Sequence, residues 1–403
     1  MVSRLSYEDC KNMLAGRRLP CAFVDMDAFD GNLMKLIGMM GASDKTMRVA
    51  TKSVRSVDML KRLFEKGGGR LKGIMSFTVE EADFLSRQGF DDLLVAYPSV
   101  QKTDMDLMCG MAKRGIDVSI VVDSPEHVRA LGEAGREAGI ELQAIIEVDM
   151  SYRPAGEGAH IGVRRSSIRS GPAALAVARE TQRVGGVRVA GIMGYEAQIA
   201  GLTDKNPFTT SMNPVKRIIK HLSKPDVLRT RDGVVRYLRN HGFELRIVNG
   251  GGTGSVSFTS GDEEVTEVAA GSGFYCPHLF DYYSDLDLEP AAFFALQAVR
   301  QPAPGMAACA GGGYIASGEI GLDRLPVPFL PKGSELLKLE GAGEAQTPVV
   351  LKKGTHLRIG DPVIFRHAKA GELAERFNEL LLVENKKIVG SALTYRGMGM
   401  CFL

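Results

Sequence analysis

Lys52 is the residue of this chain best suited to covalent chemistry. It ends the run RVATKS, whose apolar and β-branched residues are typical of a buried strand. A lysine at the carboxyl end of a strand can lie beneath loops, where loss of water favours the neutral amine that attacks a carbonyl and forms an imine. Most lysines are solvated surface groups, so the position alone also fits an ordinary exposed side chain.

Two glycine-rich turns add a second chemical signal. Segment 249–254 (NGGGTG) begins at the end of the predicted strand 243–251, and segment 270–273 (AGSG) begins at the end of the predicted strand 265–271. Glycines let the backbone approach an anion closely, so successive N–H groups and the Thr253 hydroxyl can hold a phosphate. Each turn could also be a plain flexible loop. Because barrels commonly bind phosphate after their seventh and eighth strands, the pair of turns favours a phosphate site.

The elements that would position these residues alternate between strands and helices. Amphipathic segments such as 56–67 and 79–89 separate short apolar runs, which is typical of parallel strands joined by crossover helices. Eight such runs predict a closed (β/α)8 barrel. An open doubly wound sheet is the competing interpretation, but no GxGxxG follows the first run, which disfavours a dinucleotide site. The eight predicted strands are 47–52, 73–77, 92–97, 117–122, 142–149, 187–195, 243–251 and 265–271.

The pattern changes after about residue 285. Glycine and proline turns separate apolar runs such as TPVVLKK and DPVIFRH, with little helical period, which predicts a β-rich C-terminal domain. The predicted division is an N-terminal segment, 1–20, packing with the β domain, a barrel over 21–285 and the β domain over 286–403. Within it, segment 19–36 combines a strand-like run and a short helix, expected beside the barrel entrance.

Composition excludes several classes of partner. Fifty basic and 48 acidic residues give a formal charge of +2, too small a field to predict binding to nucleic acid or to an anionic membrane. No apolar run reaches the length of a membrane span, and the first residues lack the pattern of a signal peptide. The six cysteines form no CxxC pair, as expected of reduced thiols. These features predict a cytoplasmic protein with a small-molecule substrate.

Six motifs in order carry a family resemblance. They are LPCAFVDMDAF, RVATKS, EVDMSYR, GIMGYE, IVNGGGTG and EVAAGSGFY. Their order resembles that of the fold-type III pyridoxal-phosphate enzymes, and within them the branch of D-threonine aldolase, D-serine dehydratase and 3-hydroxy-D-aspartate aldolase. The resemblance spans about residues 19–285 and continues loosely beyond. It implies an alanine racemase-like barrel followed by a β domain, in a homodimer with the active site near the subunit interface.

The resemblance also implies roles for individual residues. Lys52 matches the catalytic lysine that holds pyridoxal 5'-phosphate as an imine. Arg153 matches an arginine that contacts the pyridoxal ring oxygen, although it could form a surface ion pair instead. Tyr195 matches a tyrosine beside the cofactor or substrate, or is a core aromatic residue, and Tyr275 adds a hydroxyl to the phosphate. The residues implied to grip the phosphate are Gly251, Gly252, Thr253, Gly254, Ser272 and Gly273.

A possible metal site is where this chain departs from the resemblance. Relatives bind a divalent cation through a His-x-Asp or His-x-Cys pair that orients or activates the substrate's β-hydroxyl. Here His367 matches the first ligand, but Lys369 stands in the second position, and an ammonium group does not bind a cation. Glu372 could supply the missing oxygen to Zn or Mn. Alternatively, Lys369 replaces the metal as a fixed positive charge or binds a substrate carboxylate.

The resemblance implies a lyase acting on a small β-hydroxy D-amino acid, by aldol cleavage or by dehydration and deamination. An amino acid racemase is the alternative, and it needs a second acid or base facing Lys52. This is often a tyrosine of the partner subunit, and Tyr314 or Tyr395 could serve in that role. A non-catalytic pyridoxal-phosphate homeostasis protein is a further alternative. Such proteins are typically single barrels, so the long second domain disfavours this role.

Overall fold

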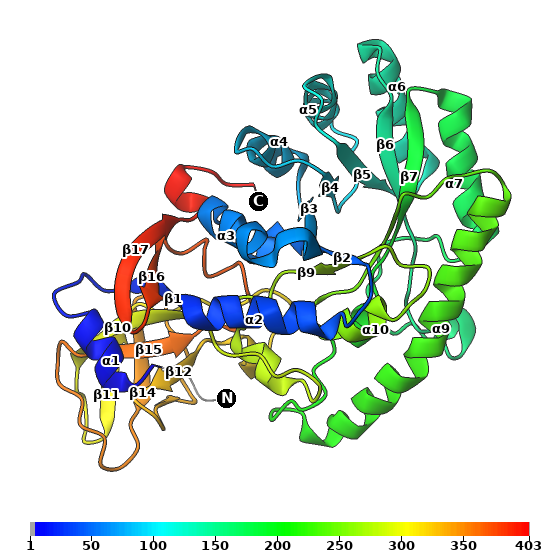
Figure 1. The fold of residues 1–403 in the computed structure, drawn as a ribbon. Coiled ribbons are helices and arrows are strands. Elements are labelled where there is room, and N and C mark those ends of the chain that lie inside the picture. The colour runs from blue at the N-terminus through cyan, green and yellow to red at the C-terminus, as the bar shows by residue number, and fades with distance from the viewer. Residues whose placement is uncertain (1–4, 403) are drawn as a thin grey trace.

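A closed parallel barrel and a β-sheet beside it form the chain (Figure 1). The computed structural model describes residues 5–402, and within them eight strands pair in sequence order, with β2 also pairing β9 to close the barrel. The predicted α/β barrel is confirmed. Its strands are β2 (Thr46–Ala50), β3 (Leu71–Ser76), β4 (Leu93–Val95), β5 (Val118–Val122), β6 (Leu142–Glu147), β7 (Val187–Gly194), β8 (Ile247–Gly250) and β9 (Glu267–Ala270).

Helices cover the outside of the barrel and begin and end at residues suited to those positions. In α6 (Pro125–Ala138) the Ser124 side chain accepts a hydrogen bond from the His127 N–H, and proline occupies the first turn. Gly139 ends this helix in the left-handed conformation, which costs glycine little. The other covering helices are α3 (Val57–Gly67), α4 (Val79–Arg87), α5 (Lys102–Lys113), α7 (Gly171–Val184), α9 (Asn213–Asn240) and α10 (Val256–Ser260).

The second sheet has nine strands among the described residues, and its strands come from both ends of the chain. The short strand β1 (Cys21–Asp25) pairs antiparallel with β10 and parallel with β16, so it lies inside this sheet rather than beside the barrel entrance. The other strands are β10 (Ala292–Arg300), β11 (Met306–Ala310), β12 (Val327–Leu330), β13 (Glu335–Leu336), β14 (Gln346–Val350), β15 (Pro362–Arg366), β16 (Glu379–Glu384) and β17 (Lys387–Leu393).

The N-terminal helix α1 (Tyr7–Met13) packs on this sheet. The Tyr7 hydroxyl donates to the Pro362 carbonyl at 3.0 Å, and Cys10 shares a buried cluster with Phe23 and Phe293. Residues 1–4 of the predicted segment 1–20 lie outside the described residues. The predicted domain ranges stay a prediction, because strand pairing alone does not define units that fold separately.

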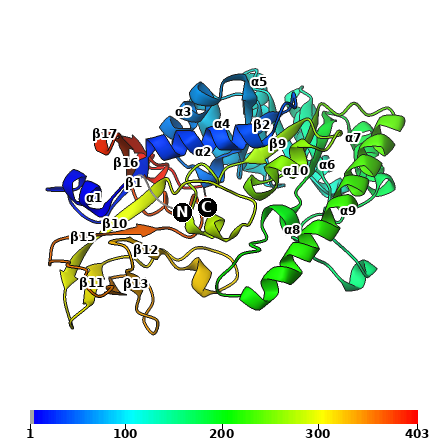
Figure 2. The same ribbon diagram turned by 60° about the horizontal axis from the view of Figure 1, so that its bottom comes forward.

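Barrel and sheet share one hydrophobic core, which fixes the position of one against the other (Figure 2). Helix α2 (Met26–Met39), longer than the short helix expected here, lies across the junction: Asn32 donates to the carbonyls of Phe274 and Glu289. Near the end of the chain, Tyr395 donates to Glu81 in α4 at 2.9 Å. No helix of residues 5–402 has the length and apolar character that crossing a membrane requires.

Candidate functional site

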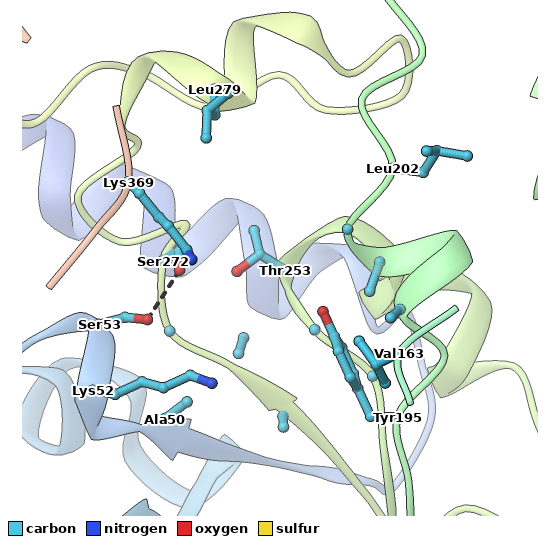
Figure 3. A pocket seen from close by; sticks show the side chains of 18 of the residues that line it. Ala50, Lys52, Ser53, Val163, Tyr195, Leu202, Thr253, Ser272, Leu279 and Lys369 are labelled. Carbon is cyan, nitrogen blue, oxygen red and sulfur yellow. Dashed lines mark hydrogen bonds between the residues drawn. The ribbon is translucent and has the colours of Figure 1, made fainter. Parts of the chain in front are cut away.

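A cavity of about 550 Å³ opens where the carboxyl ends of the barrel strands face two segments of the sheet region, 317–324 and 368–369. Both the volume and the position are typical of small-molecule sites in barrels. Figure 3 shows side chains entering this space from both sides, with Lys52 on the barrel side and Lys369 on the other. We call it the barrel cavity.

Lys52 lies at the barrel cavity, as predicted. It follows β2 in a short turn, Thr51–Ser53, where the Thr51 hydroxyl donates to the Met75 carbonyl and so fixes the turn to the neighbouring strand. The Lys52 Nζ donates to the hydroxyl of Tyr97, 3.0 Å away. Burial disfavours ionisation of Tyr97, but the cationic Lys52 and Arg165 outweigh it and lower the pKa of this phenol.

The two glycine turns meet at the cavity wall, and the second turn lies beside the turn that carries Lys52. Gly251 has φ +89°, a conformation that favours glycine. A side chain at Gly271 would place its Cβ 2.6 Å from the Ala50 carbonyl oxygen, so only glycine fits there. Hydrogen bonds join the turns: the Gly273 N–H donates to the Thr253 hydroxyl at 3.1 Å, and the Ser53 and Ser272 hydroxyls are 2.9 Å apart.

The residues predicted to bind the phosphate fall into two groups, according to whether they line the barrel cavity. Gly251, Gly252, Thr253 and Ser272 line the cavity directly. Gly254 and Gly273 do not line it and pack behind the turns, where added side chains would meet Ala200 and Thr253. The cavity lining therefore combines the Thr253 and Ser272 hydroxyls with the Lys52 amine.

A buried ion network holds the first turn in place, and the sequence analysis did not identify it. Glu196, fully buried after β7, accepts from the Gly251 N–H at 3.2 Å and from the Ser255 hydroxyl at 3.0 Å. The Arg231 guanidinium, also fully buried, bonds both Glu196 and Asp262. Since a buried charge needs a partner, Arg231 and Glu196 fix each other and, through them, the backbone of the turn.

Arg153 does not line the cavity, contrary to the prediction that it contacts the cofactor ring. Its guanidinium donates to Asp149 at 2.6 Å and to Ser151, which holds it in the loop after β6. Arg165, twelve residues later in the same loop, lines the cavity instead. Its guanidinium lies over the rings of both Tyr97 and Tyr195, 5.4 Å and 5.5 Å from their centroids.

Of the two predicted tyrosines, only Tyr195 reaches the cavity. Its ring lies at the cavity wall (Figure 3), and burial raises the pKa of its phenol to about 12, so the hydroxyl stays protonated. Tyr275 is buried behind the wall and its hydroxyl donates to the Val54 carbonyl at 3.2 Å. In this structure the Tyr275 hydroxyl therefore does not face the barrel cavity, and its predicted contact with the phosphate stays a prediction.

His367 and Glu372 are the residues expected to bind a cation. Within residues 5–402, no three His, Cys, Asp or Glu side chains gather closely enough to hold a metal ion. Both oxygens of Glu372 accept from the Ser317 N–H at 3.1 Å. His367 is buried and does not line the barrel cavity, but it lines a small pocket with Lys369 and Glu372, and burial lowers the pKa of its imidazole to about 3. The ring has no regular hydrogen bond among the described residues, although the Ala292 backbone lies close.

Tyr314 and Tyr395, considered as acid or base opposite Lys52, both lie outside the barrel cavity of their own chain. Tyr314 packs against Phe294 and Phe377. Tyr395 is fully buried and bonded to Glu81. Neither therefore supplies a second proton-transfer group to this cavity from within the same chain.

Known proteins resemble this chain in sequence. It is 25% identical over 253 residues to 3-hydroxy-D-aspartate aldolase of Paracoccus denitrificans, a match that covers 63% of this chain and 59% of the relative. It is 23% identical over 290 residues to D-threonine aldolase of an Arthrobacter species, covering 71% and 69% of the two chains. The match therefore spans less than two thirds of the first relative's length.

Solved structures show the same fold over nearly the whole chain. D-threonine aldolase from Filomicrobium marinum superposes with a TM-score of 0.80 at 19% identity, covering 96% of each chain. D-threo-3-hydroxyaspartate dehydratase from Delftia sp. HT23 has a TM-score of 0.77 at 19% identity, covering 95% of this chain and 98% of the other. A sequence model described as the alanine racemase N-terminal domain matches residues 24–277, more than half of the chain. The chain therefore belongs to the alanine racemase N-terminal domain family.

Proposed function

We propose that this chain is a pyridoxal-phosphate-dependent lyase that acts on a small β-hydroxy D-amino acid, by aldol cleavage or by dehydration. The observation that carries the proposal is that one cavity contains both the Lys52 amine and the two joined glycine turns. The aldolase and dehydratase names of the relatives support the lyase reaction over racemisation. We further propose that the chain works as a homodimer.

The lining residues fit the cofactor. The hydroxyls of Thr253 and Ser272, one from each glycine turn, would bind its phosphate, and Gly251 and Gly252 would let the backbone approach it closely. Lys52 would hold it covalently, and Arg165 would face the ring from the side of Tyr195. When bound, pyridoxal phosphate supplies an electron-withdrawing ring that stabilises the charge left when a bond at the substrate's Cα breaks.

The protein's own groups would then determine which bond at the substrate's Cα breaks, and they would transfer protons. The Lys52 amine, once free, is placed to take or return a proton at the substrate's Cα. The Tyr97 hydroxyl, 3.0 Å from the Lys52 Nζ, is placed to pass that proton on. The wall formed by segments 317–324 and 368–369 faces the barrel side of the same cavity.

The proposal is tested with the Lys52→Ala variant. We expect the wild-type protein to show the visible absorbance of a lysine-linked cofactor and Lys52→Ala to lose it. Lys61→Ala, an exposed lysine of α3, should keep it and serves as the matched control. A variant at Lys52 that keeps this absorbance would mean that another lysine carries the cofactor.

Product analysis separates the reactions. The wild-type protein is mixed with D-threonine, D-serine, 3-hydroxy-D-aspartate or D-alanine, and aldehyde, keto acid and optical rotation are followed. Aldehyde together with glycine indicates an aldolase, and keto acid together with ammonia indicates a dehydratase. Loss of rotation without either product would support the racemase instead, and a lysine-linked cofactor without change in any assay would support the homeostasis role.

A further inference from the structure

Four cationic side chains line the barrel cavity, and none has a carboxylate within ion-pair distance among the described residues. Asp323 is the one acidic residue of the lining within that part of the chain, and it accepts a hydrogen bond from Asn206 at 3.1 Å. A cavity with this excess of positive charge attracts anionic ligands. The four cations are Lys52, Arg165, Arg324 and Lys369.

Two of these cations belong to the barrel and two to the sheet region. Lys52 and Arg165 are accounted for by the proposed cofactor site. Arg324 ends the short turn Leu322–Arg324, and Lys369 follows β15, so both stand on the wall that faces the barrel. Figure 3 shows the Lys369 side chain extending into the cavity from the side opposite Lys52.

A single turn supports both wall cations. The Lys369 Nζ donates to the Ser317 hydroxyl at 3.3 Å, and Arg324 lies beside Gly318, which has φ +116°. Glu372 anchors this turn by accepting the Ser317 N–H with both oxygens. The carboxylate of Glu372 thus holds the wall in place, and two positive groups with unfilled donor positions are left facing the cavity.

The same wall disfavours a divalent cation. An ammonium at position 369 repels a metal ion, Glu372 is engaged by Ser317, and His367 lies outside the cavity. We propose that Lys369 and Arg324 form a subsite that binds a carboxylate of the substrate, and that the chain works without a divalent cation. The inference rests on the proposed function and names the substrate group that the sheet side of the cavity recognises.

The carboxylate can be the one on the substrate's Cα or one on its side chain. The chemistry is the same in both cases: Arg324 offers a planar pair of donors, and Lys369 adds a point charge. Removing one charged hydrogen-bond partner from such a site weakens anion binding by about tenfold or more. The substrates compared below distinguish the two sources.

The first test measures binding, which does not depend on turnover. Malonate and acetate are titrated into the cofactor-loaded protein by calorimetry, with Lys369→Met, Lys369→Arg and Lys353→Met compared with the wild type. We expect Lys369→Met to weaken carboxylate binding about tenfold, Lys369→Arg to retain it, and exposed Lys353→Met to match the wild type. Should Lys369→Met fail to fold, Arg324→Met tests the same wall.

Unchanged carboxylate affinity in Lys369→Met and Arg324→Met would overturn the subsite, as would a wild-type protein that binds neither probe. These outcomes are independent of the proposed lyase, whose failure appears as loss of the lysine-linked absorbance or of product. Where turnover occurs, KM is compared for D-threonine and 3-hydroxy-D-aspartate. A rise for both substrates in Lys369→Met assigns the subsite to the Cα carboxylate, and a rise for the dicarboxylic substrate alone assigns it to the side chain.

The metal content of the purified protein tests the second part of the proposal. We expect less than stoichiometric zinc and manganese by emission spectrometry, and turnover that a chelator does not lower. A stoichiometric metal that is lost in His367→Ala would overturn the inference, because it would show a cation site in place of the carboxylate subsite.

Discussion

Glu196→Gln tests whether the buried ion network supports the glycine-rich turn 249–254. The substitution keeps the size of the side chain and an oxygen that can accept the Gly251 N–H, but it removes the negative charge. Arg231, whose side chain is 0% exposed, would then keep a single carboxylate partner, Asp262. The change therefore isolates the charge from the shape of the network.

Breaking a buried pair by removing one charge costs about 3 to 5 kcal/mol, and we expect the lower end of this range because Asp262 remains. The matched control is Glu141→Gln, which breaks the exposed Glu141–Arg188 pair of 3.2 Å on the same barrel. An exposed pair contributes about 0 to 1 kcal/mol. The two variants should therefore differ by at least about 2 kcal/mol in the free energy of unfolding.

Urea unfolding of both variants, followed by circular dichroism, measures this difference. Retention of pyridoxal phosphate during dialysis gives a second readout, because a displaced glycine turn 249–254 should weaken cofactor binding in Glu196→Gln, whereas Glu141→Gln should retain the cofactor. Equal unfolding midpoints and equal cofactor retention in the two variants would refute the reasoning.

Three further changes test the barrel and the site. Burial raises the pKa of Glu147 to about 7, so the folded chain keeps a proton that the unfolded chain loses near 4.5; stability should fall as pH rises between these values, and Glu147→Gln should flatten that fall in urea unfolding. Gly73→Ala should lower the free energy of unfolding by more than about 1 kcal/mol, because Gly73 has φ +71° and the added Cβ would collide with the Arg48 guanidinium. Tyr97→Phe should slow the exchange of substrate amine with Lys52 in stopped-flow absorbance while leaving the bound cofactor in place, since it removes the hydroxyl bonded to the Lys52 Nζ; an unchanged rate would contradict that role.

Local patterns predict the barrel well because each strand and its crossover helix are formed by consecutive segments of the sequence. The predicted strand 117–122 corresponds to Val118–Val122, and 187–195 to Val187–Gly194. The predicted strand 243–251 was too long, since β8 begins at Ile247 after the chain leaves Gly242 in a left-handed turn. The place of Lys52 at a strand end and the place of both glycine turns follow from the same local reasoning.

Contacts between segments that are distant in the sequence could not be predicted from local patterns. Arg153 and Arg165 share one loop, and only the folded loop reveals which guanidinium reaches Tyr195. Glu196 stood within a recognised motif, but its burial against Arg231 depends on a helix that no motif identified. The charge of these side chains was visible in the sequence, whereas their partners depend on tertiary packing.

Strand β1 lies between β10 and β16, which are synthesised much later than β1. Ala22 of β1 pairs with Phe294 of β10 and with Leu380 of β16. The first strand of the sheet to be synthesised can therefore pair only after these later strands are made. Lys369 stands just ahead of β16 on that late-forming layer. During synthesis the barrel strands therefore precede β16, and β1 gains its second neighbour only after the chain has been made as far as Glu384.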